Sequence, residues 1–147
     1  MGDYTPIALQ HVNLTVPPGK LQLATEFYGE VIGFHSDPVP ALQRDMLLWF
    51  RIGNGPQQIH VAFEKDPTHH STQSSRHPCF QLSSPEALLA LQKRIWEHHK
   101  SGSQAAALEC DEPGKENSGA KGAEYPTRFF ARDYAGNRLE FSAIQSQ

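Results

Sequence analysis

The stretch LLWFRIGNGPQQIHVAF (47–63) decides the fold, because a second stretch, TRFFARDYAGNRLEFSA (127–143), lies over it without a gap. Each stretch has an apolar and aromatic run, a glycine-containing turn and a returning run, which is the pattern of a β-hairpin. The register pairs three positions: Trp49 with Phe129, Phe50 with Phe130, and His60 with Glu140. Internal repetition is a fold-level signal, so the chain is predicted to contain two similar halves.

A strand and a helix are predicted ahead of the first hairpin. Residues 8–16 alternate with period two, which indicates a strand. Its polar face is typical of a lined cavity and carries His11, Asn13 and Thr15. Apolar residues over 21–32 recur at helical spacing and Gly33 follows them, so a helix is predicted to cover the sheet.

The second half begins in the same way, with a strand that starts at His77. Either Ser83 or Ser84 is predicted to cap the helix that follows, and Pro85 suits the first turn of that helix. If Ser83 is the cap, Glu86 completes a capping box. The order of elements in the second half therefore repeats that of the first.

The predicted fold class is α+β, with two βαβββ modules in a single domain. Module one spans about 8–64 and module two about 77–144, and the polar residues 65–76 join them. Residues 105–110 suit a further strand of module two. Residues 111–124, rich in glycine and charge, are predicted to form a long loop that could cover a substrate.

Composition limits the function classes. The 147 residues suffice for one domain core, and no run is long and apolar enough for a membrane span. Cys79 and Cys110 are too few for a disulfide framework, so free thiols and a reducing, cytoplasmic location are predicted. The net charge is −3 without a basic stripe, which argues against nucleic acid and favours a small-molecule ligand.

Four residues, each on a different predicted strand, could hold a metal ion. They are His11, His60, His77 and Glu140. If the halves are related by a pseudo-twofold axis, equivalent strands bring all four together. Three imidazoles and a carboxylate suit one divalent ion such as Zn, Ni, Co, Mn or Fe. Binding needs neutral imidazoles and is expected to weaken as the pH falls.

The sequence resembles the vicinal oxygen chelate superfamily, which includes glyoxalase I, extradiol dioxygenases and bleomycin-resistance proteins. Five segments carry the resemblance: HVNLTV, EFYGEVIGF, QIHVAF, HPCFQL and RDYAGNRLEF. The resemblance implies paired βαβββ modules that form a curved sheet around a metal-binding cavity, often in a homodimer, with each site built either within one chain or across subunits. Matching by motif puts the metal positions on the same four residues.

Two departures from the superfamily narrow the expected chemistry. In glyoxalase I the position of His60 is usually a carboxylate, and a glutathione-binding arginine stands where this chain has Thr15, which argues against glutathione use. Thiol transferases and extradiol dioxygenases typically use only the ligands that match His11, His77 and Glu140. Four protein ligands in an octahedral shell leave two positions for a bidentate substrate, which favours isomerase or lyase chemistry.

The leading hypothesis is therefore a metal-dependent, glyoxalase-type enzyme acting through an enolate, in which Glu140 or a metal-bound hydroxide moves a proton. Candidate substrate contacts share faces with the ligands or wall the cavity, and they are Asn13, Gln81, Arg138, Trp49 and Phe129. Two alternatives remain: an extradiol-type dioxygenase that uses His11, His77 and Glu140, and a non-catalytic drug-binding protein of the bleomycin-resistance kind.

Overall fold

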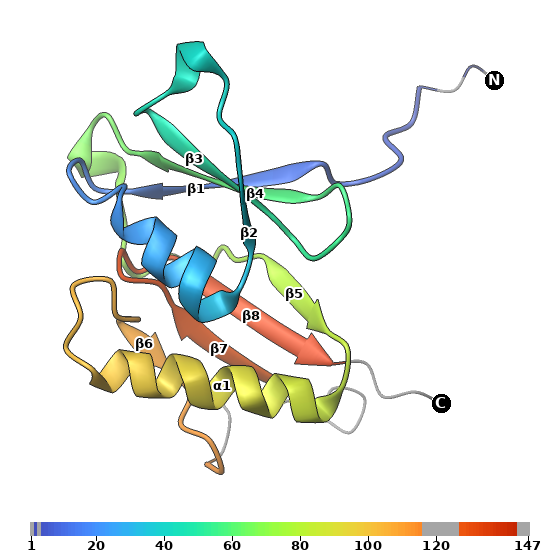
Figure 1. The fold of residues 1–147 in the computed structure, drawn as a ribbon, viewed down its shortest axis with the longest axis vertical. Coiled ribbons are helices and arrows are strands. Elements are labelled where there is room, and N and C mark those ends of the chain that lie inside the picture. The colour runs from blue at the N-terminus through green and yellow to red at the C-terminus, as the bar shows by residue number, and fades with distance from the viewer. Residues whose placement is uncertain (1, 3, 116–126, 144–147) are drawn as a thin grey trace.

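The computed structural model describes residues 2, 4–115 and 127–143 and contains two four-stranded sheets (Figure 1). The first sheet has the order β1-β4-β3-β2, and β1 runs parallel to β4. Its strands are β1 (His11–Val16), β2 (His35–Asp37), β3 (Leu47–Arg51) and β4 (Gln58–Phe63). The second sheet repeats this plan as β5-β8-β7-β6, with β5 parallel to β8. Its strands are β5 (Cys79–Leu82), β6 (Glu109–Cys110), β7 (Arg128–Arg132) and β8 (Arg138–Ala143).

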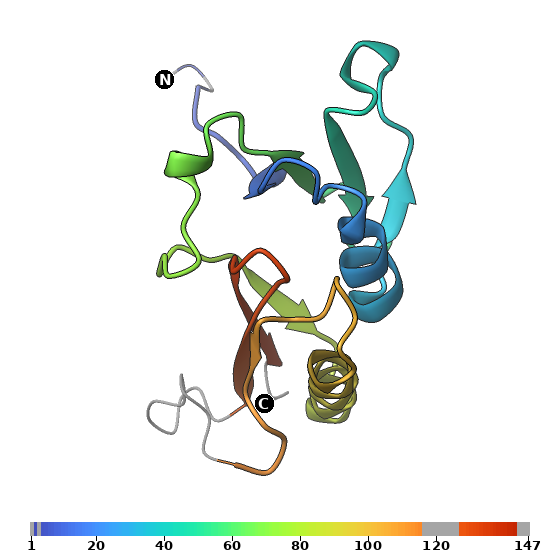
Figure 2. The ribbon, with the colours of Figure 1, turned by 90° about the vertical axis from the view of Figure 1, so that its left-hand side faces the viewer.

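Each module has one long helix on one face of its sheet (Figures 1 and 2). The π-helix η1 (Thr25–Ile32) belongs to module one, and α1 (Pro85–Lys100) to module two. Ser84, rather than Ser83, caps α1, because its side chain accepts a hydrogen bond from the backbone N–H of Ala87. Two short 3₁₀ turns, η2 (Ala41–Gln43) and η3 (Pro67–His69), complete the elements.

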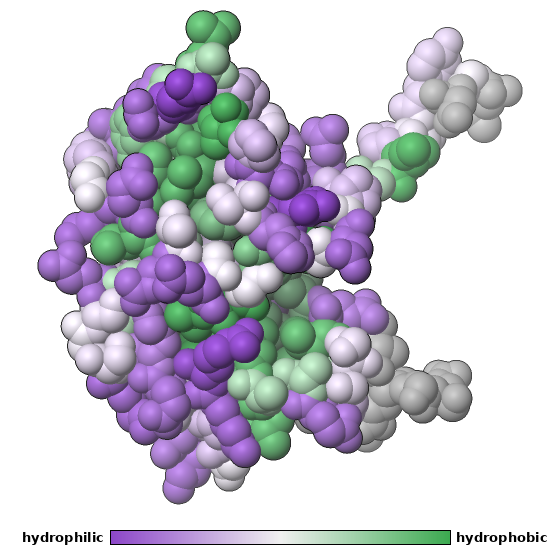
Figure 3. All heavy atoms as spheres, in the orientation of Figure 1, coloured by the Kyte–Doolittle hydropathy of each residue, from purple (hydrophilic) through white to green (hydrophobic). Residues whose placement is uncertain are grey.

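One hydrophobic core runs through both modules. The two helices touch, since the Arg94 guanidinium of α1 donates to the carbonyl oxygen of Val31 in η1 at 2.5 Å. The rings of Phe34 and Phe80 meet edge to face across the modules at 5.2 Å between centroids. On the face drawn in Figure 3, hydrophobic residues gather in the middle of each half and hydrophilic residues surround them. The helix-covered faces of the sheets are therefore buried in the core, and a ligand can bind only at the opposite, uncovered faces.

The predicted order of strand, helix and three strands is confirmed in both halves, but the gapless register is wrong by one residue. Trp49 pairs with His60 across the first hairpin, whereas Phe130 pairs with Glu140 across the second. Six residues (52–57) connect the paired ends of β3 and β4, and five (133–137) connect those of β7 and β8. A slip of one residue turns a side chain to the other face of a sheet.

Several helices and strands are shorter than predicted. The first strand begins at residue 11 instead of 8, and η1 begins at Thr25 rather than 21. Residues 105–108 lie outside β6, partly because the carbonyl oxygen of Ala107 is 2.6 Å from the Nδ1 atom of His99 and cannot pair with a strand. The predicted loop 111–124 falls from residue 116 onward outside the described residues.

The polar connection between the modules is held against the second hairpin rather than solvated along its length. The Nε2 atom of His70 lies 2.6 Å from the carbonyl oxygen of Ala135, and the Arg132 guanidinium donates to the carbonyl oxygen of Ser74 at 3.0 Å. Within the described residues, no helix is long and apolar enough to cross a membrane.

Candidate metal centre and ligand cavity

Three rings stand in a stack across the uncovered face of the first sheet. Trp49, His60 and His11 come from the adjacent strands β3, β4 and β1. The Trp49 and His60 rings are 4.6 Å apart with an interplanar angle of 7°, and the His60 and His11 rings are 4.0 Å apart at 11°. His60 alternates with the buried residues Ile59 and Val61, so it points away from the helix-covered face. Both imidazoles of module one therefore lie side by side on one surface.

The tautomer of His60 is fixed by a chain of polar groups. The amide nitrogen of Gln58 donates to the carboxylate of Asp37 at 2.9 Å, which turns the amide oxygen of Gln58 toward His60. That oxygen lies 2.9 Å from the Nε2 atom of His60. Because a carbonyl oxygen only accepts hydrogen bonds, Nε2 carries the proton and Nδ1 keeps a lone pair.

The environment of His60 also favours its neutral form. Partial burial lowers the pKa of His60, and the neighbouring His11 lowers this pKa further because two adjacent imidazolium charges repel. A neutral imidazole is the form that can bind a metal ion.

The second sheet presents a histidine beside a carboxylate. The Nε2 atom of His77 lies 3.5 Å from a carboxylate oxygen of Glu140, whose side chain is 9% exposed. The other carboxylate oxygen of Glu140 accepts from the Arg128 guanidinium at 3.1 Å. The Nδ1 atom of His77 donates to the carbonyl oxygen of Ser75 at 2.8 Å. The Nε2 atom of His77 thus faces the carboxylate of Glu140 and is the nitrogen that bears the lone pair in the neutral imidazole.

Phe130, not Phe129, is the aromatic residue on the Glu140 face. Phe129 is fully buried and stacks on Phe141 in the core at 4.9 Å, so it does not border the uncovered face. Phe130 meets the ring of His77 edge to face at 5.4 Å. The carboxylate partner Arg128 and the wall residue Phe130 were missed from sequence, although the shorter turn of the second hairpin could have revealed the shift in register.

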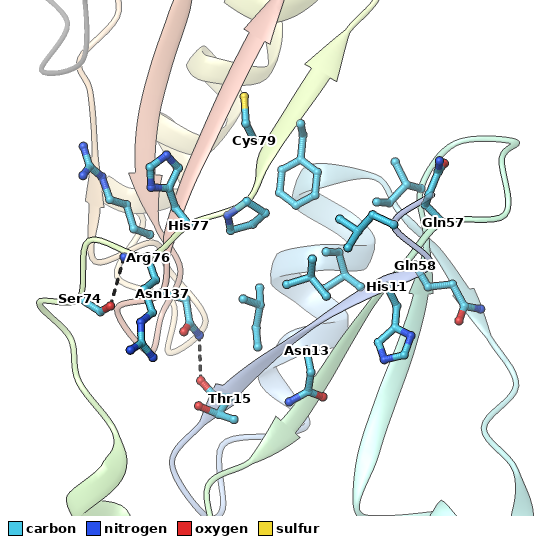
Figure 4. Close-up of a pocket in the computed structure, with 18 of the residues that line it drawn as sticks. His11, Asn13, Thr15, Gln57, Gln58, Ser74, Arg76, His77, Cys79 and Asn137 are labelled. Carbon is cyan, nitrogen blue, oxygen red and sulfur yellow. Dashed lines mark hydrogen bonds between the residues drawn. The ribbon is translucent and has the colours of Figure 1, made fainter. Parts of the chain in front are cut away.

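A cavity of about 960 Å³ lies between the modules and is bordered by one member of each ligand pair, His11 and His77, but not by His60 or Glu140 (Figure 4). His11 and Asn13 line it from β1, and His77 lines it from the segment before β5 (Figure 4). Gln81 and Arg138 line it as well. Three of the predicted substrate contacts therefore border this cavity.

The four predicted ligands form two pairs rather than one cluster. Among the residues that the structure describes, no three histidine, cysteine, aspartate or glutamate side chains come together in an arrangement that could hold a metal ion. His11 and His60 stay on the first sheet, and His77 and Glu140 stay on the second. The expectation that a pseudo-twofold axis within one chain unites all four is therefore not met.

The two cysteines are free, as predicted. Cys79 lies beside the metal-ligand candidates, and its sulfur is 3.5 Å from the hydroxyl oxygen of Ser142. Burial raises the pKa of Cys79, and for the same reason the pKa of Cys110 rises to about 12. Both side chains are therefore thiols at neutral pH rather than nucleophilic thiolates.

The Asp133-x-x-Gly136-Asn137 motif joins the modules. Asp133 is fully buried, and one of its carboxylate oxygens accepts a hydrogen bond from the Tyr28 hydroxyl of η1 at 2.5 Å. The side-chain amide of Asn137 donates both to Asp133 at 2.9 Å and to the carbonyl oxygen of Thr15 in β1 at 2.8 Å. The motif therefore fixes how β1 lies relative to the second hairpin.

Solved structures with the same architecture were found, whereas no family model and no curated protein matches the sequence. A glyoxalase family protein from Bacillus anthracis is 25% identical, covers 99% of this chain and 100% of its own, and has a TM-score of 0.67. The fosfomycin resistance protein FosX from Listeria monocytogenes, complexed with Mn(II) and a dihydroxypropylphosphonic acid, is 14% identical with a TM-score of 0.69 and coverages of 96% and 95%. TnmS3, an antibiotic binding protein from a Streptomyces species, is 14% identical with a TM-score of 0.63 and coverages of 97% and 100%.

Proposed function

Because this chain has the paired βαβββ fold of the vicinal oxygen chelate superfamily, we propose that it is a metal-dependent enzyme of the glyoxalase type. Its substrate would be a small molecule that chelates the metal through two neighbouring oxygens, and its reaction an isomerisation or a lyase step. One observation carries the proposal: His77 and Glu140 lie 3.5 Å apart on one uncovered sheet face, with the Nε2 atom of His77 toward the carboxylate.

The four candidate side chains are of the types that bind a divalent cation. His11, His60, His77 and Glu140 supply three imidazoles and a carboxylate, which suit Zn, Ni, Co, Mn or Fe. His60 keeps an unprotonated nitrogen through its contact with Gln58. Bound there, such a cation supplies Lewis-acid polarisation of two substrate oxygens.

We place the complete site between two copies of the chain. One copy would contribute His11 and His60, and the other His77 and Glu140, because the described part of a single chain holds these pairs apart. A twofold dimer uses the same surface on both subunits, so it would contain two equivalent sites.

The remaining residues of the site would hold the substrate and move its proton. Glu140 is nearly buried and is fixed by Arg128, so its carboxylate is kept in one orientation for proton transfer. The amide side chains of Asn13 and Gln81 border the cavity and can orient substrate oxygens. Phe130 packs against His77 and limits the access of water to that side.

Metal analysis of the purified, tag-free protein tests this proposal. Wild type should hold one stoichiometric ion of Zn, Ni, Co, Mn or Fe per chain after refilling, and His60→Ala and Glu140→Ala should each lose it. His69→Ala is the matched control, because His69 lies in the exposed η3 turn. Full metal content in either ligand variant would reject the assignment of that residue.

A protein that only sequesters a small molecule is the second candidate. It is favoured by the fact that no three ligands meet within the described residues, and the antibiotic-binding neighbour has the same fold. Wild type without metal after refilling, together with binding of small aromatic compounds, would support this candidate.

A further inference from the structure

We propose that the guanidinium of Arg138 binds an anionic group of the substrate, a carboxylate or a phosphonate. The inference rests on the proposed function in that it names the substrate class of the same site. It starts from the charges on the uncovered face of the second sheet, where Arg128, Arg132 and Arg138 accompany the carboxylates of Glu140 and Glu109.

Two of these arginines already have partners. Arg128 donates to Glu140 at 3.1 Å. Arg132 donates to the carbonyl oxygens of Ser74 and Gly136 and lies 3.5 Å from a carboxylate oxygen of Glu109. Their positive charge is thus largely offset by groups of the protein.

Arg138 differs from both. Its guanidinium has no ion-pair or hydrogen-bond partner within the described residues, and its central carbon lies 4.1 Å from the ring centroid of Phe130. Stacking on an aromatic ring holds the planar guanidinium in place without using its N–H donors. A fixed arginine with free donors is suited to two parallel hydrogen bonds with a carboxylate or phosphonate.

The position of Arg138 adds a reason for an anion to bind there. Arg138 lies directly opposite Arg132 in the β7–β8 pairing, but the ion pair with Glu109 serves Arg132 and leaves the charge of Arg138 without a carboxylate partner among the described residues. The large cavity is lined by Arg138, Arg76 and one acid, Glu64. Its lining therefore carries a net charge of +1 (two arginines less one glutamate, histidines neutral) in a chain whose net charge is −3.

The spacing limits the size of the substrate. Arg138 and Glu140 are two residues apart on the same face of β8, which is a separation of about 7 Å along a strand. If Arg138 binds the anionic group of the substrate, a substrate atom only a few bonds from that group would lie beside Glu140. We therefore expect a short acid rather than a long or neutral molecule.

The test is a titration of the metal-free, full-length protein with methylphosphonate, acetate and neutral acetamide, followed by the arginine N–H signals in NMR. The two anions should shift the Arg138 signal to saturation, and acetamide should not. Arg138→Met keeps bulk over Phe130 but removes the charge, and should weaken anion binding about tenfold or more. Arg44→Ala removes the same charge from an exposed position of module one and should bind as wild type.

The outcomes separate the two proposals. Equal anion affinity in wild type and Arg138→Met, or no saturable binding in wild type, would overturn the anion site even if metal binds. Loss of binding in Arg138→Met from a wild type that takes up no metal would support the anion site and reject the metal-dependent reaction. Preference for acetate or for methylphosphonate would decide which of the two anionic groups the substrate carries.

Discussion

The two modules repeat one fold but present opposite chemistry on their uncovered faces. Module one shows a stack of three rings, Trp49, His60 and His11, and the nearby acid Asp37 is occupied by Gln58 and Arg51. Module two shows arginines around the buried carboxylate of Glu140. The two hairpins therefore share one backbone plan while the side chains on their uncovered faces differ in charge.

This difference explains why neither face is a complete metal site. Two imidazoles without a carboxylate give module one no anionic ligand, and one imidazole beside a carboxylate gives module two only two ligands. A face of each kind supplies three imidazoles and a carboxylate, whereas two module-one faces supply no anionic ligand.

The largest expected effect comes from mixing variants that damage different modules. His60→Ala and Glu140→Ala, each without metal alone, should regain binding when they are unfolded, mixed and refolded together. In a site shared by two copies, each mixed dimer has one undamaged site of two, so random pairing restores about one quarter of the wild-type metal content. Metal analysis of the mixture checks this.

The control is a mixture of His60→Ala with His11→Ala, which damages module one in every chain and should restore nothing. If the His60→Ala and Glu140→Ala mixture also stays empty while wild type binds metal, the ligands are contributed within one chain.

Replacing the glycines of the two hairpin turns by alanine should lower the free energy of unfolding by different amounts. Gly136 has a φ angle of +90°, and an added Cβ would lie 2.6 Å from the backbone Cα atom of Thr72. Gly53 also has a positive φ, +56°, but nothing lies within 4 Å of its added Cβ. Gly53→Ala should cost about 1 kcal/mol for the left-handed backbone alone, whereas Gly136→Ala should cost about 3 kcal/mol or more.

Urea unfolding of both variants measures this difference in the free energy of unfolding. Equal losses would mean that the connection between the modules does not rest on the second hairpin in solution.

The same two hairpins show which site residues can be predicted from the sequence and which cannot. Period-two alternation and the repeat correctly placed His60 and Glu140 on equivalent returning strands, because β4 and β8 align without a gap. They misplaced Phe129, because a turn shorter by one residue rotates β7 without leaving a strong signal in the apolar run.

Other features lay beyond pattern reading because they depend on contacts between distant segments. Tyr28 reaches Asp133 only after the modules have packed, because the two residues are 105 positions apart in the chain. The separation of the ligand pairs likewise depends on how the modules dock, which hydrophobic periodicity within each module does not specify.

Removing a tyrosine hydroxyl at the junction between the modules should lower the free energy of unfolding more at Tyr28 than at Tyr134. Tyr28→Phe removes the hydroxyl that donates to the buried Asp133 and should cost about 1–3 kcal/mol. Tyr134→Phe is the matched control, because the Tyr134 hydroxyl is buried without a hydrogen-bond partner in the described structure. Its loss should be close to neutral in thermal or urea unfolding, and a larger loss in Tyr134→Phe than in Tyr28→Phe would contradict the assigned role of Asp133.

The smallest expected effect is the pH dependence of stability that comes from the ring stack of module one. Module two has no such stack among its described residues. Burial and the charge of His11 lower the pKa of His60 below its usual 6.5, so the folded protein binds this proton less tightly than the unfolded chain does. The stability of the metal-free protein should therefore be full above pH 6.5 and should fall as the pH drops toward the lowered pKa. In His11→Ala the pKa of His60, followed by NMR, should rise toward its usual value and the stability should depend less on pH. An unchanged His60 titration would leave burial as the whole cause, and the stack would then contribute nothing electrostatic to the difference between the two faces.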